Sequence, residues 1–408
     1  MNTALPEQVV EITDILNRRG FEAFAVGGCV RDMVSGKIPD DYDITTNALP
    51  EEVKEVFADF KTIDTGIKHG TVTVVVNGFF AEVTTYRIDG DYKDNRRPET
   101  VTFSLRLEED LSRRDFTINA LAYNPKNGLV DIFGGVKDIE DKIIRCVGNP
   151  KERFNEDALR ILRAIRFASV LGYNVEKNTA EAVHENAYLL ENISKERIFA
   201  ETKKLLCGKN VVFVLEEYRD IAEIIFPGLA YISDENYSLS AKMVSLAEGA
   251  ELKLAAILYF AAADDAALML RRLKSDKATV SRVTETLSCR LPCIPDSESN
   301  ALKCLYLAGE KVVLDYLVLK ALYYEALGED EKAKQILSWL DTIKKTADSG
   351  KCFKLSQLKV NGSDLINEKI ACGSDIGKML KNLLLEVVEG RLCNNRDELL
   401  KYAKNLKI

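Results

Sequence analysis

The sequence predicts an α+β protein, in which a head that combines a small sheet with helices is followed by an all-helical remainder. Residues 1–150 alternate short β-rich runs with helical periodicities, and strand patterns nearly vanish after them. At 408 residues the chain is long for one hydrophobic core, so roughly two to four domains are expected. We expect four domains: residues 1–150, 151–208, 209–345 and 346–408.

The pattern of the head predicts its elements one by one. Helical periodicity covers residues 6–20, and residues 21–26 read as a strand that runs into two glycines. Residues 71–87 predict a β-hairpin, because Asn77-Gly78, a favoured two-residue turn, separates two β-rich runs.

The later residues read as successive helices. Residues 155–172 carry the strongest amphipathic pattern. The apolar run 254–263 is about half a membrane span and predicts a buried core helix. A late linker is expected at residues 346–352. Residues 351–408 hold eleven Lys and Arg against seven Asp and Glu, a local charge of +4 in a chain whose net charge is −8.

The composition excludes several classes of protein. With two histidines, His69 and His184, the chain cannot build a histidine-rich zinc site or a histidine-based metallophosphohydrolase. Nine scattered cysteines are typical of reduced thiols in a cytoplasmic protein, and the N-terminus shows no secretory signal. The net charge argues against indiscriminate nucleic-acid binding but allows a local basic surface.

Two carboxylates stand two residues apart in the segment 36–50. If this segment is a strand, Asp41 and Asp43 share a face, about 6–7 Å apart along the chain. At an effective dielectric near 20 they repel each other by roughly 2–3 kcal/mol, and a cation between them would turn this cost into binding energy. Glu82, on the returning strand of the hairpin, is a candidate third carboxylate, although a solvated strand position explains it as well.

A glycine pair precedes this acidic segment. Gly27-Gly28 at a strand end lets the backbone approach a phosphate, and the helix that follows adds its positive end. Arg31 supplies a charged fork suited to a triphosphate. Alone, the pair is as well explained by a tight turn. Ahead of two aspartates, it predicts an anion pocket beside a divalent-metal pocket, as phosphoryl or nucleotidyl transfer requires, and carboxylate ligands suit Mg²⁺.

The segment 110–124 carries charged and polar side chains at helical spacing. Arg114 could meet phosphates, while Asp115 and Asn119, four residues apart, could bond ribose hydroxyls. A helix N-terminus with surface charges is the alternative.

A second charged stripe lies in residues 156–163. On a helix, Asp157 and Arg160 are neighbours, and Arg163 continues the stripe. A carboxylate beside a guanidinium matches the base edges of cytosine and adenine, whereas guanine and uracil present the wrong pattern. An exposed ion pair on a helix is the alternative.

Together and in this order, the motifs resemble the class II tRNA nucleotidyltransferases, the CCA-adding enzyme family that includes bacterial poly(A) polymerases. The segments that carry the resemblance are GGCVRD (27–32), DYDI (41–44), DGDYKDNRRPE (89–99), RRDFTINALAY (113–123), DIFGG (131–135), EDALRILRAIRFA (156–168), ISKERI (193–198) and LKVNGSDLI (358–366). One departure is Ile132, where the family usually has proline, at a position outside the proposed chemistry.

The resemblance implies a polymerase-β-like head with a small mixed sheet, followed by all-helical neck, body and tail domains. It also implies a role for each candidate residue: Asp41 and Asp43 bind catalytic Mg²⁺ with Glu82 beside them; Gly27, Gly28 and Arg31 hold the triphosphate; Arg114, Asp115 and Asn119 place the nucleotide; Asp157 and Arg160, with Arg163 on the same stripe, form the template that selects CTP and then ATP.

The implied activity is template-independent addition or repair of the 3′-terminal CCA of tRNA from CTP and ATP, with no DNA or membrane partner. The alternatives within the family are an enzyme that adds only A, one that adds only CC, and a poly(A) polymerase. The charged loop 87–99 resembles the element that switches the pocket from C to A, which disfavours the CC-only enzyme, and poly(A) polymerases tend to have longer, more basic ends. A tRNA-binding protein without chemistry is the alternative from another class.

Overall fold

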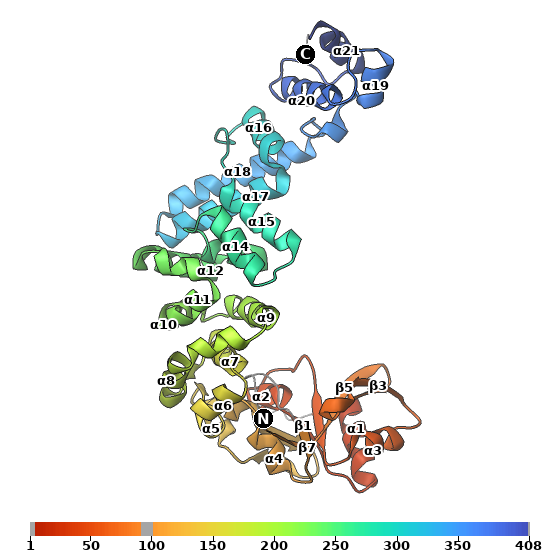
Figure 1. Cartoon of the computed structure of the whole chain (residues 1–408), viewed down its shortest axis with the longest axis vertical. Helices are drawn as coiled ribbons and strands as arrows, with labels where there is room; N and C mark the ends of the chain where they lie inside the picture. The colour runs from red at the N-terminus through yellow and green to blue at the C-terminus, as the bar shows by residue number, and fades with distance from the viewer. Residues whose placement is uncertain (1–4, 91–100, 407–408) are drawn as a thin grey trace. The chain divides into compact units, whose positions relative to one another are not determined.

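The computed structural model describes residues 5–90 and 101–406. The chain forms two compact units, Met1–Pro227 and Gly228–Ile408. Every strand in the described ranges belongs to the first unit, and the second consists of helices and their connections (Figure 1). This arrangement confirms the prediction of an α+β head followed by a helical remainder. The finer boundaries after residues 150, 208 and 345 stay predictions.

The first unit is built on one seven-stranded sheet. Its strands are β1 (Ala23–Val26), β2 (Asp43–Thr46), β3 (Lys61–Gly66), β4 (Thr71–Val76), β5 (Phe79–Thr85), β8 (Leu121–Asn124) and β9 (Gly128–Asp131). Their order is β3-β4-β5-β2-β1-β8-β9. The sheet is mixed, because β2 and β5 run parallel while the other neighbours run antiparallel. Two short pairs complete the strands: β6 (Arg87–Asp89) with β7 (Val101–Phe103), and β10 (Ile143–Ile144) with β11 (Asn174–Val175).

The predicted hairpin is confirmed as β4 and β5. Val76 pairs with Phe79, so the turn consists of Asn77 and Gly78 alone. Both turn residues have positive φ, 51° and 80°. Asparagine and glycine adopt this left-handed region more easily than other residues, and such a turn matches the twist of the two strands.

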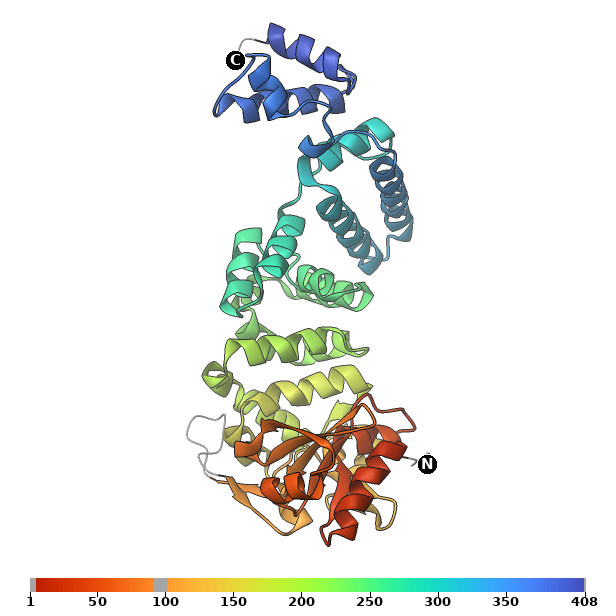
Figure 2. The same cartoon turned by 90° about the vertical axis from the view of Figure 1, so that its right-hand side faces the viewer.

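Helices flank the sheet and continue beyond it (Figure 2). The helices of the first unit are α1 (Glu7–Arg18), α2 (Gly28–Val34), α3 (Pro50–Val56), α4 (Leu107–Ser112), α5 (Gly135–Glu140), α6 (Pro150–Glu156), α7 (Leu159–Phe167), α8 (Lys177–Glu185), α9 (Lys195–Leu206), α10 (Val211–Glu217) and α11 (Arg219–Ile225). The helix expected over residues 6–20 is confirmed as α1, which packs against β1 and α3. One core cluster joins β1 and β8 to α4 through Phe24, Leu111 and Ala122.

The continuous helix expected over residues 155–172 is wrong in one respect. α6 ends at Glu156 and α7 begins at Leu159, with Asp157 between them in an extended conformation (φ −131°, ψ 102°). The Asp157 carboxylate accepts a hydrogen bond from the Leu159 backbone N–H at 3.1 Å. Aspartate favours helix starts because its side chain satisfies a backbone donor there, so the acidic residue ends one helix and begins the next.

The second unit contains α12 (Asp234–Leu246), α13 (Ala250–Ile257), α14 (Ala263–Arg272), α15 (Lys277–Ser288), α16 (Glu298–Ala308), α17 (Glu310–Ala326), α18 (Asp330–Asp348), α19 (Gly362–Asn367), α20 (Asp375–Val388) and α21 (Arg396–Asn405). α18 ends inside the expected linker 346–352. One cluster of buried side chains joins α16, α17 and α18, and another joins α19, α20 and α21. The described part of the chain has no helix that is both long and apolar enough to cross a membrane.

The apolar run 254–263 is not a single helix. It spans the end of α13, a turn, and the first residue of α14. Leu254 and Leu258 are fully buried on either side of the helix end. Residues 254–258 therefore lie in the core as expected, whereas residues 259–263 are partly or fully exposed. The hydrophobic pattern did not mark the turn because the turning residues are themselves apolar.

Candidate active site

The three candidate carboxylates gather at one end of β2. Asp43 is the first residue of β2 and is paired in register with Glu82 on β5. Asp41 precedes the strand by two residues, so the expectation that both aspartates lie in the strand is wrong. All three residues are exposed. The parallel pairing of β2 and β5 brings Glu82 beside Asp43, and this register could not be deduced from the hairpin alone.

The charges of Asp41 and Glu82 act on Asp43. Desolvation by the surrounding protein, together with the negative charges of Asp41 and Glu82, raises the pKa of Asp43 to about 6. The positive charge of Arg114 opposes this shift. The pKa of Asp43 therefore responds to two like charges, which raise it, and to one arginine, which lowers it.

These residues fit a hard divalent cation that arrives with a substrate. The described part of the chain contains no group of three or more His, Cys, Asp or Glu side chains that could hold a metal ion by itself. Mg²⁺ does not require one, because it is usually held by one or two carboxylates together with substrate phosphates and water. The uncompensated charge that raises the pKa of Asp43 is what such a cation would relieve. Asp41 and Asp43 are thus the residues that could hold it, with Glu82 next to them.

The glycine pair begins α2 directly after β1. Gly27 has φ +80°, a conformation that side chains rarely adopt, and a Cβ atom built on it would lie 3.0 Å from Arg114 Nη1. Glycine is therefore needed here both for the backbone angle and for the close approach of the arginine. Gly28 has a more ordinary environment, since its Cβ would lie 3.8 Å from Arg31 Nη2.

Arg31 belongs to a chain of charged and polar contacts. Its guanidinium donates two hydrogen bonds to Asp32 at 2.9 Å and one to Asn119 Oδ1 at 2.9 Å. Asn119 donates in turn to Asp115 Oδ1 at 3.1 Å, and Asp115 Oδ2 accepts from Arg163 Nε at 2.7 Å. The structure thus brings four predicted residues, Arg31, Asn119, Asp115 and Arg163, into one network.

Asp115 is the buried centre of this network. Burial by itself would raise the pKa of its carboxyl, but the Arg163 guanidinium and the Asn119 hydrogen bond lower it to about 2. Asp115 and Asn119 do not lie on a helix, as their spacing suggested: Asn119 ends a single 3₁₀ turn that begins at Thr117. The two side chains are nevertheless in direct contact, through the hydrogen bond that Asn119 donates to Asp115.

Arg114 has a different partner. Its Nη2 donates to Asp110 Oδ2 at 3.2 Å, while its buried Nε has no hydrogen-bond partner in the described ranges. Asp110 is fully buried and also pairs with Arg113, and Thr45 of β2 donates to it at 3.2 Å. Asp110 therefore ties Arg114 to the strand that begins with Asp43.

The residues proposed to read the base lie at the break between α6 and α7. Asp157 accepts from Arg197 Nη2 of α9 at 2.9 Å. Arg160 is 7% exposed and donates to Glu156 at 2.5 Å and to the Arg113 carbonyl at 2.7 Å. These contacts take the place of the helical ion pair between Asp157 and Arg160 that was the alternative interpretation, because Asp157 stands before α7 and not on it. Arg197 and Glu156 are partners that spacing did not suggest.

Comparison with known proteins decides the family. A family model described as "Poly A polymerase head domain" matches residues 23–145, and one for "tRNA nucleotidyltransferase domain 2" matches residues 247–403. The chain is 36% identical to the CCA-adding enzyme of Ligilactobacillus salivarius over 410 residues, which cover 98% of this chain and 96% of that protein. It is 38% identical to the CCA-adding enzyme of Limosilactobacillus fermentum, with 98% of each chain covered. The chain belongs to the CCA-adding enzyme family.

Solved structures of CCA-adding enzymes agree with this assignment. The crystal structure of the Bacillus stearothermophilus CCA-adding enzyme in complex with CTP superposes with a TM-score of 0.80 at 32% identity, covering 99% of this chain and 98% of that one. The Thermotoga maritima CCA-adding enzyme complexed with tRNA shares the fold, with a TM-score of 0.63 at 21% identity and 99% and 97% of the chains covered. The predicted CCA-adding enzyme family and the predicted enzyme class are confirmed.

Sequence reasoning did not single out five residues that the structure places in these networks: Asp32, Asp110, Glu156, Phe167 and Arg197. Phe167 ends α7, and the guanidinium carbons of Arg31, Arg163 and Arg166 lie 5.3, 5.4 and 3.7 Å from the centre of its ring. Asp110 is four residues before Arg114, a spacing that could have drawn attention to it. The others lie inside motifs that were recognised as a whole. The charged loop 87–99 falls largely on residues 91–100, which lie outside the described residues.

Proposed function

We propose that the protein is a template-independent tRNA nucleotidyltransferase that adds or repairs the 3′-terminal CCA of tRNA with CTP and ATP. The observation that carries the proposal is the environment of Asp43, which is acted on by the charges of Asp41 and Glu82 and by that of Arg114. In this proposal the carboxylates that would hold a cation and the arginine that would hold a phosphate act on the same residue. Nucleotidyl transfer needs this combination, because a triphosphate and its Mg²⁺ bind together.

In the proposed reaction the tRNA 3′-hydroxyl attacks the α-phosphate in line. A bond forms between the 3′-oxygen and the α-phosphorus, the bond from the α-phosphorus to the bridging oxygen breaks, and pyrophosphate leaves. The hydroxyl loses its proton during the attack. When bound, two Mg²⁺ ions would lower the pKa of this hydroxyl and stabilise charge on the leaving pyrophosphate. Asp41 and Asp43 would hold them, and Glu82 would add negative charge beside them.

The arginines and glycines would hold the nucleotide. Gly27 and Gly28 let the triphosphate approach the backbone, and Arg31 and Arg114 supply positive charge. Arg31 is already oriented by Asp32 and Asn119, so less side-chain entropy is lost when a phosphate binds. In this proposal Asp115 and Asn119 place the ribose, and Arg163 keeps Asp115 ionised.

The break between α6 and α7 would select the base. Asp157 would accept from the exocyclic amine of cytosine or adenine, and Arg160 would donate to the neighbouring ring nitrogen. The contact from Arg197 to Asp157 and that from Glu156 to Arg160 support this role, because each holds one member of the pair in place. Neither guanine nor uracil presents the matching pattern of donors and acceptors.

The basic segment 351–408 would bind the tRNA through contacts with its phosphates. Several of its cations are used in ion pairs, such as Arg396 with Asp364 and Lys404 with Glu368. Lys359, Lys381 and Lys401 are exposed, and none of them is a proposed catalytic residue.

A cytoplasmic location stays a prediction from the cysteine content.

The test is an extension assay with Mg²⁺ on two substrates, a tRNA that lacks its whole 3′ end and a tRNA that already ends in CC. Each receives CTP alone, ATP alone, or both. Addition of three nucleotides to the first substrate, after which growth stops, is the expected result.

The other outcomes separate the alternatives. A single A added only to the CC-ended tRNA would indicate an A-adding enzyme, and a long ladder of A would indicate a poly(A) polymerase. Binding of nucleotide without any product would indicate a tRNA-binding protein without chemistry.

A further inference from the structure

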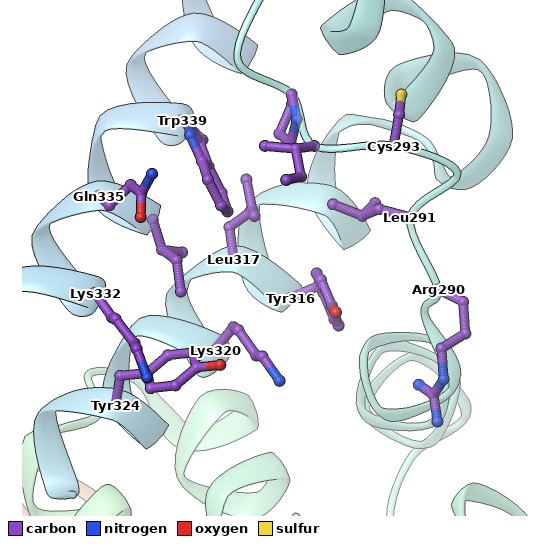
Figure 3. Close-up of a pocket in the computed structure, with 13 residues that line it drawn as sticks. Arg290, Leu291, Cys293, Tyr316, Leu317, Lys320, Tyr324, Lys332, Gln335 and Trp339 are labelled. Carbon is purple, nitrogen blue, oxygen red and sulfur yellow. The ribbon is translucent and has the colours of Figure 1, made fainter. Parts of the chain in front are cut away.

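The second unit contains a cavity that none of the proposed catalytic residues touches. It lies between α17, α18 and the segment that follows α15, and its volume is about 420 Å³ (Figure 3). Sites for small organic ligands fall in this size range. The carboxylates and arginines of the proposed active site all belong to the first unit, so the cavity requires its own explanation.

Aromatic and aliphatic side chains form most of its wall. Trp339 and Tyr316 are only partly buried, while Leu317 and Ile336 are 1% and 4% exposed and close the interior. Figure 3 shows the ring of Trp339 turned toward Leu317 and the centre of the cavity. Partly exposed aromatic faces above an apolar floor favour a flat, apolar ligand group.

Cations line the same cavity, and no Asp or Glu in the described ranges lines it. Arg290 is exposed and donates to the carbonyls of Leu287 and Cys289, at 3.2 and 2.8 Å, which leaves its charge without a carboxylate there. The Lys320 ammonium lies over the ring of Tyr324, 5.5 Å from its centre. In a chain with a net charge of −8, this local excess of positive charge favours an anionic group on the ligand.

We propose that this cavity binds a nucleoside phosphate unit, whose base stacks on Trp339 and whose phosphate meets Arg290 and Lys320. Stacking of bases on aromatic rings next to cations is how many proteins bind single-stranded nucleic acids without a preference for sequence, and the same contacts suit one nucleotide. The Gln335 amide, which also lines the cavity, offers both a donor and an acceptor to the base edge. The unit comes either from a free nucleotide or from an unstacked nucleotide of tRNA, since both present the same chemistry.

Trp339 makes the site directly measurable because it is the single tryptophan of the chain. We expect its fluorescence in the full-length protein to be quenched saturably, without Mg²⁺, either by ATP and CTP or by a tRNA that lacks CCA. Quenching by the free nucleotides identifies a free-nucleotide site, and quenching by the tRNA alone identifies a nucleotide of the RNA. The readout is binding and not extension, so its outcome is independent of the proposed catalysis.

Variants decide whether the signal comes from the cavity. We expect Arg290→Ala together with Lys320→Ala to weaken the binding about tenfold. Lys344→Ala, which removes an exposed lysine of α18 that does not line the cavity, should leave it unchanged. The proposal is overturned if neither ligand changes the fluorescence, or if the double variant binds as the unchanged protein does.

Discussion

The two halves of the proposed active site, around Asp43 and around Asp115, shift the pKa of their central carboxyl groups in opposite directions. At the start of β2, like charges lie together, and desolvation together with Asp41 and Glu82 raises the pKa of Asp43 to about 6. At the centre of the neighbouring network, Asp115 faces Arg163, and its pKa falls to about 2. Binding of a cation would relieve the repulsion between the carboxylates of the first group. In the second group, Arg163 already balances the charge of Asp115. We infer that the first group takes part in the chemical step and that the second is a preformed, rigid network that places the ribose.

The largest expected effect is that of Asp43→Asn. It should reduce the rate of nucleotide addition about a thousandfold or more, because a ligand of the catalytic Mg²⁺ is lost. Stability in urea should not fall, since the substitution removes a repelled charge. The matched control is Asp40→Asn, at an exposed neighbouring position, which should leave the rate unchanged. Full activity of Asp43→Asn would contradict the metal-binding role.

For Asp115→Asn we expect a loss of stability, in contrast to Asp43→Asn. Removing this buried carboxylate leaves Arg163 without its partner, and the free energy of unfolding should fall by about 3 kcal/mol. Urea unfolding followed by circular dichroism measures the change. Asp141→Asn, which breaks the exposed ion pair with Lys137, should have no measurable effect. If Asp115→Asn were as stable as the unchanged protein, the contrast between the two groups would not hold.

The pH dependence sharpens the same contrast. Because the pKa of Asp43 is raised, its carboxyl gains a proton as the pH falls through about 6, and it then competes less well for Mg²⁺. The Mg²⁺ concentration needed for half-maximal rate should rise about tenfold per pH unit below that point. Asp115 stays ionised throughout, since its pKa is about 2. A Mg²⁺ requirement that is the same above and below pH 6 would rule out this account of Asp43.

A smaller effect is expected in the network that holds the residues proposed to read the base. Arg197→Gln removes the partner of Asp157 and should raise KM for CTP and ATP about tenfold, with less effect on kcat, because Asp157 is no longer held in place. Lys204→Gln, an exposed change on the same helix, is the control. Steady-state rates with each nucleotide measure both constants. Unchanged KM values would show that Asp157 does not depend on Arg197.

The smallest effect is expected when exposed lysines are removed from the basic segment 351–408. Substituting Lys359, Lys381 and Lys401 by Gln should weaken tRNA binding several-fold and reduce its dependence on salt, because fewer counterions are released. Filter binding at several salt concentrations measures both quantities. If affinity and salt dependence stay the same, the last segment does not grip tRNA through these lysines.

Local patterns predicted those features that depend on neighbours in the chain. The hairpin at Asn77 and Gly78 was predicted because only a few residues adopt its turn, and the glycine pair was found because it ends a strand. The helix break at Asp157 was missed, although aspartate is a common helix cap, because the amphipathic pattern continues across it. The turn after Ile257 was missed because its residues are themselves apolar.

By itself, the sequence determined the class of the fold and the family, and it predicted the residues proposed to carry the chemistry, because these depend on residue types and on the order of the motifs. Only the tertiary structure decided which charges meet. The parallel pairing of β2 with β5 places Glu82 beside Asp43, and the fold brings Arg163 to Asp115 and Arg197 to Asp157 across 48 and 40 residues of sequence. Contacts over such distances follow from packing and strand register, which no local pattern encodes.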